Sequence, residues 1–76
     1  MADIFTERLQ IAIHQSNLSQ QEIANKAHLS KQVVSDFKTG KSFPSIQTLR
    51  LLCEALEVSA DYLLGLEDEN GNRKYR

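Results

Sequence analysis

This 76-residue sequence has one cysteine, one proline and no long apolar run. One cysteine cannot form a disulfide within the chain, so we expect a reducing compartment, the cytoplasm. No stretch approaches the roughly 18 apolar residues of a membrane span, and the N-terminus lacks the basic-then-apolar pattern of a signal peptide. The length allows one domain at most. These absences predict a cytoplasmic, single-domain chain that does not engage a membrane.

The sequence also lacks the side-chain groupings on which enzymes and metal sites depend. It contains no Cys/His, Ser/His or paired-carboxylate constellation at a useful spacing. His14 and His28 lie far apart and have no other soft ligand near them. Cys53 sits within an apolar stripe, as a small core residue does. We therefore expect no enzymatic activity, no cofactor and no metal.

An excess of positive charge is missing as well, because the formal net charge is -1. The charges are nevertheless segregated along the chain. Residues 20–45 hold four lysines against two carboxylates, a local charge of +2, whereas residues 1–19 and 46–64 together carry -3. A positive segment within a near-neutral chain is suited to contact with phosphate.

Helices are predicted throughout, because no run alternates with period two for long enough to form a strand. Each helix start has a polar capping residue, and Ser19 with Glu22 has the spacing of a capping box. Gly40 and Gly65 stand where the third and fifth helices should end. The predicted caps are Asp3, Ser19, Ser30, Ser45 and Ser59, and the predicted helices span about 4–15, 20–27, 31–39, 46–56 and 60–64.

The apolar positions of these helices predict one small core in an all-α fold. The expected core residues are Phe5, Leu9, Ala12 or Ile13, Ile23, Ala24, Ala27, Val34, Phe37, Ile46, Leu49, Leu52, Cys53, Leu56 and Leu63.

The segment from Gln20 to Phe37 is the most informative part of the sequence. Its letters QQEIANKAHLSKQVVSDF give two short amphipathic helices joined by a tight turn, with the small Ala24 at their crossing point. This pattern is typical of a helix-turn-helix, whose second helix lies in the DNA major groove.

The chain from about Phe5 to Gly65 resembles the phage-repressor (Cro-like, XRE) family. Beyond the helix-turn-helix, the resemblance rests on Leu18-Ser19-Gln20, Gly40-Lys41, Pro44-Ser45, Thr48-Leu49, Val58-Ser59 and Asp61-Tyr62-Leu63-Leu64-Gly65, in this order and spacing. It implies a compact five-helix, lambda-repressor-like DNA-binding domain over residues 1–65, followed by a charged tail or linker over 66–76. It also implies a bacterial or phage-encoded repressor that binds a palindromic operator in double-stranded DNA as a homodimer.

Two features depart from the family pattern. His28 replaces the usual glycine of the inter-helix turn, where a left-handed residue other than glycine costs about 1 kcal/mol. Lys38 stands where the family often has Arg or Glu, and Asp36 places a negative charge on a surface expected to meet DNA. The second departure concerns which bases would be preferred.

The face of the third helix opposite Val34 and Phe37 is polar and should meet the bases. Gln32 suits adenine, Lys31 suits guanine and Val33 suits a thymine methyl group. Asp36 would accept from a cytosine amino group or orient Lys31 or Gln32. The predicted base contacts are Lys31, Gln32, Val33, Ser35 and Asp36. The alternative for Lys31 and Gln32 is an ordinary solvated surface, and for Asp36 a solvated or intramolecular role.

Phosphate contacts are predicted on either side of this helix. Gln20 is assigned by the resemblance, because its amide adjoins the free N–H groups and the positive end of the second helix. Thr39, Lys41 and Ser42 follow the third helix and are the other predicted phosphate contacts.

A dimer surface is predicted at the C-terminal end of the domain. The consecutive apolar residues of 62–66 cannot all face inward from one helix, which leaves Tyr62, Leu64 and Leu66 partly exposed. The alternative is that these residues cover the first helix of the same chain.

Two further functions stay open on the sequence alone. One is a protein-interaction module that kept the fold and lost DNA binding, as the near-neutral charge and Asp36 would allow. The other is an antitoxin-like regulator that binds both DNA and a regulatory protein partner.

Overall fold

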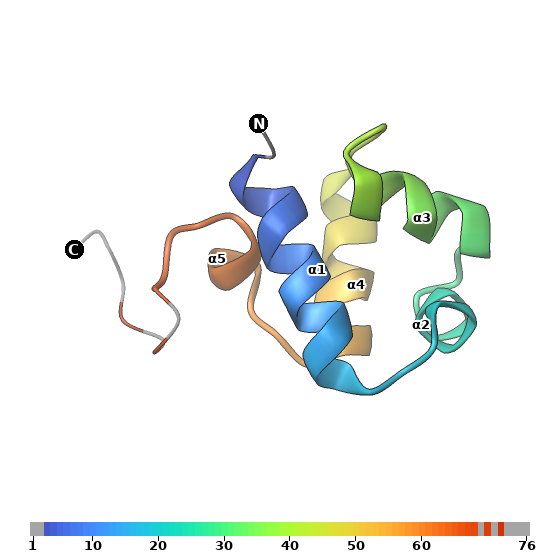
Figure 1. Cartoon of the computed structure of the whole chain (residues 1–76), viewed down its shortest axis with the longest axis horizontal. Coiled ribbons are helices and arrows are strands. Elements are labelled where there is room, and N and C mark those ends of the chain that lie inside the picture. The colour runs from blue at the N-terminus through green and yellow to red at the C-terminus, as the bar shows by residue number, and fades with distance from the viewer. Residues whose placement is uncertain (1–2, 69, 71, 73–76) are drawn as a thin grey trace.

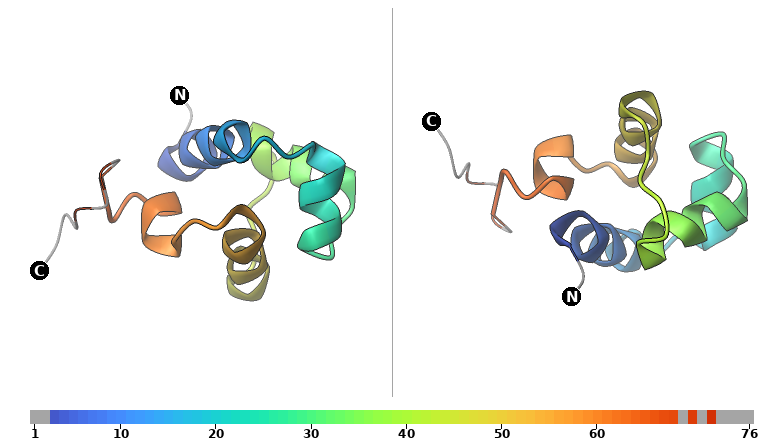
Figure 2. Two further views of the ribbon diagram at one scale, coloured as in Figure 1. Left: turned by 90° about the horizontal axis from the view of Figure 1, so that it is seen from below. Right: turned by 90° about the horizontal axis from the view of Figure 1, so that it is seen from above.

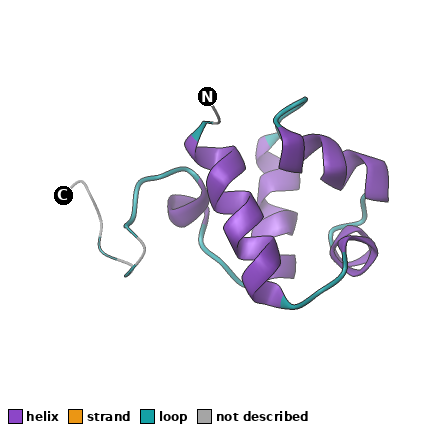
Figure 3. Ribbon diagram, in the orientation of Figure 1, coloured by secondary structure: helices purple, strands orange, loops and turns teal. Residues whose placement is uncertain are grey.

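The computed structural model describes residues 3–68, 70 and 72. The elements are five helices: α1 Ile4–Ser16, α2 Gln20–Lys26, α3 Lys31–Thr39, α4 Ile46–Leu56 and α5 Ala60–Leu63 (Figures 1 and 3). The predicted ranges agree with these bounds to within one residue at each end. Of the predicted tail, residues 69, 71 and 73–76 lie outside the described part of the chain.

Each helix begins at the capping residue that the sequence predicts. The side chains of Asp3, Ser19, Ser30, Ser45 and Ser59 accept hydrogen bonds from main-chain N–H groups of the first turns. At α2 the capping box is complete, because Glu22 in turn accepts from the Ser19 N–H at 2.9 Å. Local side-chain chemistry therefore sets where the helices start.

Two glycines adopt the left-handed conformation where helices end. Gly40 ends α3 with a φ of 81°, and Gly65 follows α5 with a φ of 79°. At Gly65 a Cβ atom would lie 2.8 Å from Cγ1 of Ile4, so the site also requires glycine for close packing against the start of α1.

Helix α1 forms the centre of the fold and packs against α3, α4 and α5. The α2–α3 pair and α5 lie at opposite ends of the molecule in all three views (Figures 1 and 2). Side chains from all five helices meet in one core, where Leu9, Ile23, Val34, Leu52 and Leu63 have no exposed surface. The helix-turn-helix and the C-terminal helix α5 therefore pack against the same core.

The predicted core is wrong at Ile46, which is 87% exposed. Ile46 lies on the apolar stripe of α4, but at its outer end: Leu49 is half-buried and Leu52 is fully buried. Periodicity identifies the face of a helix, whereas burial depends on how far the neighbouring helices extend along it.

Other core predictions are confirmed or refined. Of Ala12 and Ile13, the structure buries Ala12, while Ile13 is half-buried against the core, as are Leu49 and Cys53. Ala55 is buried although it was not predicted, and so are two polar residues of α1, Thr6 and Arg8. Polar side chains such as those of Thr6 and Arg8 carry no apolar signal by which the sequence could have revealed their burial.

Candidate nucleic-acid interface

The turn between α2 and α3 brings the two helices into a compact pair. Ala24 and Ala27 have no exposed surface, which lets the helices approach closely. His28 has a φ of 58°, so the left-handed turn residue expected from the sequence is present. The Leu29 N–H donates to the Ala24 carbonyl at 2.8 Å, and Ser30 then caps α3. Histidine is among the residues other than glycine that adopt this left-handed conformation more often.

The N-terminal end of α3 is hydrogen-bonded to Gln20, the residue that begins α2. The side-chain Nε2 of Gln20 donates to the Lys31 carbonyl oxygen at 3.1 Å. Gln20, Lys31, Gln32 and Ser35 line one shallow depression between the two helices. Gln20, one of the four predicted phosphate contacts, is therefore adjacent to three of the predicted base contacts.

The C-terminal end of α3 is hydrogen-bonded to Gln10 of α1, a contact that the sequence analysis did not predict. Its Nε2 donates to the Lys38 carbonyl oxygen at 2.7 Å. Lys38 lies in the last turn of α3, where carbonyl groups have no partner within the helix. Gln10 is one of several exposed polar residues on α1, so nothing in its local sequence distinguishes it.

The exposed face of α3 carries the predicted base-contacting residues. Lys31 and Gln32 are exposed, whereas Ser35 and Asp36 are half-buried. Val33 is also half-buried and packs against the core, which leaves only part of its side chain to meet a base. Val34 and Phe37 are buried, as the helical wheel predicts.

Asp36 is paired with Gln32 one helical turn earlier. Gln32 Nε2 donates to Asp36 Oδ1 at 2.9 Å. This contact is one that the sequence analysis considered for Asp36. The contact joins two exposed or half-exposed side chains on the polar face of α3.

The segment after α3 folds back onto the helix through Asp36. The main-chain carbonyl of Asp36 accepts from the N–H of Lys41 at 2.9 Å and from that of Ser42 at 3.4 Å. The Thr39 hydroxyl donates to the Ser35 carbonyl at 3.0 Å. Thr39, Lys41 and Ser42, the other predicted phosphate contacts, are all exposed beside the end of α3.

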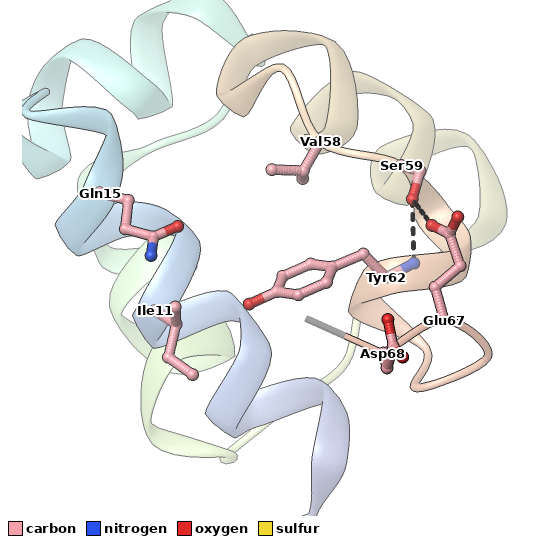
Figure 4. A pocket seen from close by; sticks show the side chains of 7 residues that line it. All are labelled: Ile11, Gln15, Val58, Ser59, Tyr62, Glu67 and Asp68. Atoms are coloured by element: carbon pink, nitrogen blue, oxygen red, sulfur yellow. Dashed lines mark hydrogen bonds between the residues drawn. The ribbon is translucent and has the colours of Figure 1, made fainter. Parts of the chain in front are cut away.

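The predicted dimer residues fall into two different surroundings. Leu64 is 46% exposed and lines a small apolar groove with Phe5, Phe43, Pro44 and Leu49. Leu66 is 38% exposed. Tyr62 is half-buried, and its ring lies in a separate depression facing Ile11 and Gln15 of α1 (Figure 4).

Arg8 explains why Tyr62 is held against its own chain. The guanidinium carbon of Arg8 lies 4.6 Å from the centre of the Tyr62 ring. Arg8 Nη1 also donates to the carbonyl oxygens of Tyr62 and Glu67, at 3.0 and 2.9 Å. Glu67 in turn accepts from the Ser59 hydroxyl (Figure 4). Residues 66–68 at the start of the predicted tail are thereby attached to α1 and α5.

The described residues contain no group of three or more His, Cys, Asp or Glu side chains placed to hold a metal ion. None of the five described helices combines the length and hydrophobicity that a membrane span requires.

The comparisons with known proteins agree with this geometry. The helix-turn-helix family matches residues 9–63 of the chain. The HTH-type transcriptional activator BcrR of Enterococcus faecalis is 30% identical over 64 residues, which cover 84% of this chain and 31% of BcrR. The uncharacterized HTH-type transcriptional regulator YqaE of Bacillus subtilis (strain 168) is 33% identical over 61 residues, which cover 80% of this chain and 53% of YqaE. The chain thus spans about a third to a half of the length of these relatives.

The fold is similar to that of the P22 c2 repressor in its crystal structure with synthetic operator 9T. The TM-score is 0.76 at 24% sequence identity, over 83% of this chain and 96% of that chain. This similarity confirms the predicted five-helix, repressor-like fold.

Proposed function

This chain belongs to the helix-turn-helix family, and we propose that it is a sequence-specific DNA-binding transcriptional regulator of the repressor type. In this proposal α3 enters the major groove of an operator and reads its bases. The observation that carries it is the exposed polar face of α3, which is held at one end by Gln20 and at the other by Gln10. A polar face supported in this way is suited to rigid docking against base edges.

Base recognition is assigned to Lys31, Gln32, Val33, Ser35 and Asp36. Lys31 and Gln32 are the most exposed of these and stand at the start of α3, the end that enters the groove first in helix-turn-helix proteins. Lysine donors match guanine O6 and N7, and a glutamine amide matches adenine N6 and N7. The exposed part of Val33 is suited to a thymine methyl group.

Phosphate binding is assigned to Gln20, Thr39, Lys41 and Ser42. Gln20 stands at the N-terminus of α2, and its amide is already turned toward α3. Thr39, Lys41 and Ser42 lie at the opposite end of α3. Contacts at both ends of the recognition helix would fix its register along the duplex without reading sequence.

We further propose that two chains pair on a palindromic operator through the surface around Leu64. Leu64 and Leu66 are exposed apolar residues, and Phe43 beside Leu64 is 58% exposed. Tyr62 is half-buried and contributes the exposed part of its side chain. A single recognition helix reads only a few base pairs, so pairing that sets two of them about one DNA turn (~34 Å) apart supplies the missing specificity.

The proposal is tested by selecting bound duplexes from a random pool with the full chain and then measuring mobility shifts at fixed salt. We expect an inverted repeat to be selected. Gln32→Ala should reduce the preference for one base pair per half-site by about 1–3 kcal/mol, whereas Gln20→Ala should weaken binding evenly across sequences. Enrichment of no sequence would contradict the proposal and favour a protein-interaction module of the same fold.

A further inference from the structure

The pairing of Gln32 with Asp36 fixes which way the glutamine amide faces. The two residues are one turn apart on the recognition helix α3, and Gln32 Nε2 lies 2.9 Å from Asp36 Oδ1. An ionised carboxylate can only accept hydrogen bonds, so the amide atom that faces it must be the nitrogen. The amide of Gln32 therefore has one favoured orientation, although both side chains belong to a solvent-facing surface.

This orientation leaves a specific set of groups available for DNA. One of the two N–H bonds of Gln32 Nε2 is directed at Asp36, which leaves one N–H donor and the Oε1 acceptor. Adenine presents an acceptor at N7 and a donor at N6 in the major groove, which matches that pair. Guanine presents two acceptors, N7 and O6, and would need both N–H groups of a freely turning amide.

We propose that Asp36 is a positioning residue that makes Gln32 selective for adenine over guanine. The inference rests on the proposed function, because it requires α3 to lie in the major groove. Asp36 then acts in two separable ways. Its acceptor oxygen orients Gln32, and its negative charge opposes the approach of phosphate at every sequence.

The two effects are distinguished by substituting Asp36 in the presence and in the absence of Gln32. Asp36→Ala removes both the acceptor and the charge, whereas Asp36→Glu keeps the charge and a carboxylate that can only accept. Asparagine is unsuitable, because its amide can turn a donor as well as an acceptor toward Gln32. If orientation is the role of Asp36, Asp36→Ala should bind non-selected DNA more tightly than the parent chain, and it should lower the adenine-to-guanine preference in the parent chain but not in Gln32→Ala.

The measurement uses the full chain and the duplex that it selects from a random pool. Gln32→Ala first identifies the base pair that Gln32 reads, and all four bases are then compared there by competition at fixed salt. We expect the adenine-to-guanine preference to fall by about tenfold or more in Asp36→Ala and to stay within about threefold of the parent in Asp36→Glu. Adding Gln32→Ala to Asp36→Ala should cause no further loss at this position.

Two results would overturn the inference while leaving the proposed function intact. One is an Asp36→Ala variant that selects the parent sequence with the parent's adenine preference. The other is an equal fall in the adenine-to-guanine preference when Asp36→Ala is made in the parent chain and in Gln32→Ala, which would assign the effect to charge. Failure of the parent chain to select any sequence would instead overturn the proposed function, and this inference with it.

Discussion

Gln10 of α1 and Lys38 of α3 are joined by a 2.7 Å hydrogen bond between the side-chain amide of Gln10 and the main-chain carbonyl of Lys38. The residues are 28 positions apart in sequence. The bond ties the end of the recognition helix to the central helix of the fold. It complements the bond from Gln20 to the Lys31 carbonyl at the other end of α3.

Loss of the Gln10 side chain should therefore weaken DNA binding without changing which sequence is bound. We expect Gln10→Ala to lower affinity by about 2- to 10-fold at every site, in line with one hydrogen bond of about 0.5–1.5 kcal/mol. Mobility shifts on selected and scrambled duplexes provide the measurement. Gln15→Ala is the matched control, because Gln15 is an exposed glutamine of the same helix, and equal behaviour of the two variants would contradict the prediction.

Arg8 should be a major determinant of stability, because it is only 8% exposed. Its guanidinium contacts the Tyr62 ring and donates to the carbonyl oxygens of Tyr62 and Glu67. Arg8→Met keeps most of the aliphatic stem but leaves two carbonyl oxygens without their donor. We expect a loss of about 2–4 kcal/mol in the free energy of unfolding, measured by urea denaturation. A midpoint equal to that of the parent chain would show that the Arg8 contacts add nothing to stability.

Phe37 and Ile46 provide a direct test of the core boundary. Phe37 is 5% exposed, and Phe37→Ala should cost roughly 3–5 kcal/mol, enough to unfold much of so small a domain. Ile46 is 87% exposed, and Ile46→Ala should change stability by no more than about 0.5 kcal/mol. Thermal melts of the two variants should thus differ widely, and similar melting temperatures would refute the observed core.

Stability should decline in acid partly through Glu22. The hydrogen bond from the Ser19 main-chain N–H, aided by the Ser19 hydroxyl, holds the pKa of Glu22 below its ordinary value of 4.5. A lowered folded-state pKa contributes stability above about pH 4.5 that is lost as the pH falls through the folded value. Urea titrations at pH 7 and pH 3 should show a smaller loss in Glu22→Gln than in the parent.

This difference should be partial, because two other carboxyl groups behave in the same way. A hydrogen bond from the Thr6 hydroxyl lowers the pKa of Asp3, and one from the Asn72 main-chain N–H lowers that of Asp68. An identical acid response of the parent and Glu22→Gln would show that Glu22 does not contribute.

Leu64 should control pairing of the chains. Leu64→Glu places a charge in the apolar groove beside Phe43 and should convert a dimer to a monomer at micromolar concentration without unfolding it. Gln21→Glu is the control, because Gln21 is an exposed residue of α2, at the opposite end of the molecule from α5 (Figure 1). Sedimentation of the variants, free and on operator DNA, gives the measurement. A parent chain that stays monomeric in both conditions would contradict the proposed dimer.

The sequence by itself determined the five helices and the helix-turn-helix. Capping depends on residues within one turn of each other, so Ser19 with Glu22 and Ser30 with the Val33 N–H are set locally. The apolar spacing of 23, 24, 27, 34 and 37 likewise indicates which faces of α2 and α3 are buried. For these features the sequence analysis and the structure agree.

Only the tertiary structure decided which polar residues have partners far away in the sequence. Gln10 meets Lys38, and Arg8 meets Tyr62 and Glu67, across sequence separations of 28, 54 and 59 residues that no local pattern reports. Ile46 follows the same periodicity as Leu52 but lies where no neighbouring helix covers it. Local chemistry and periodicity specify the elements and their inner faces, whereas the contacts between elements depend on how far each one extends and where the packed helices place its side chains.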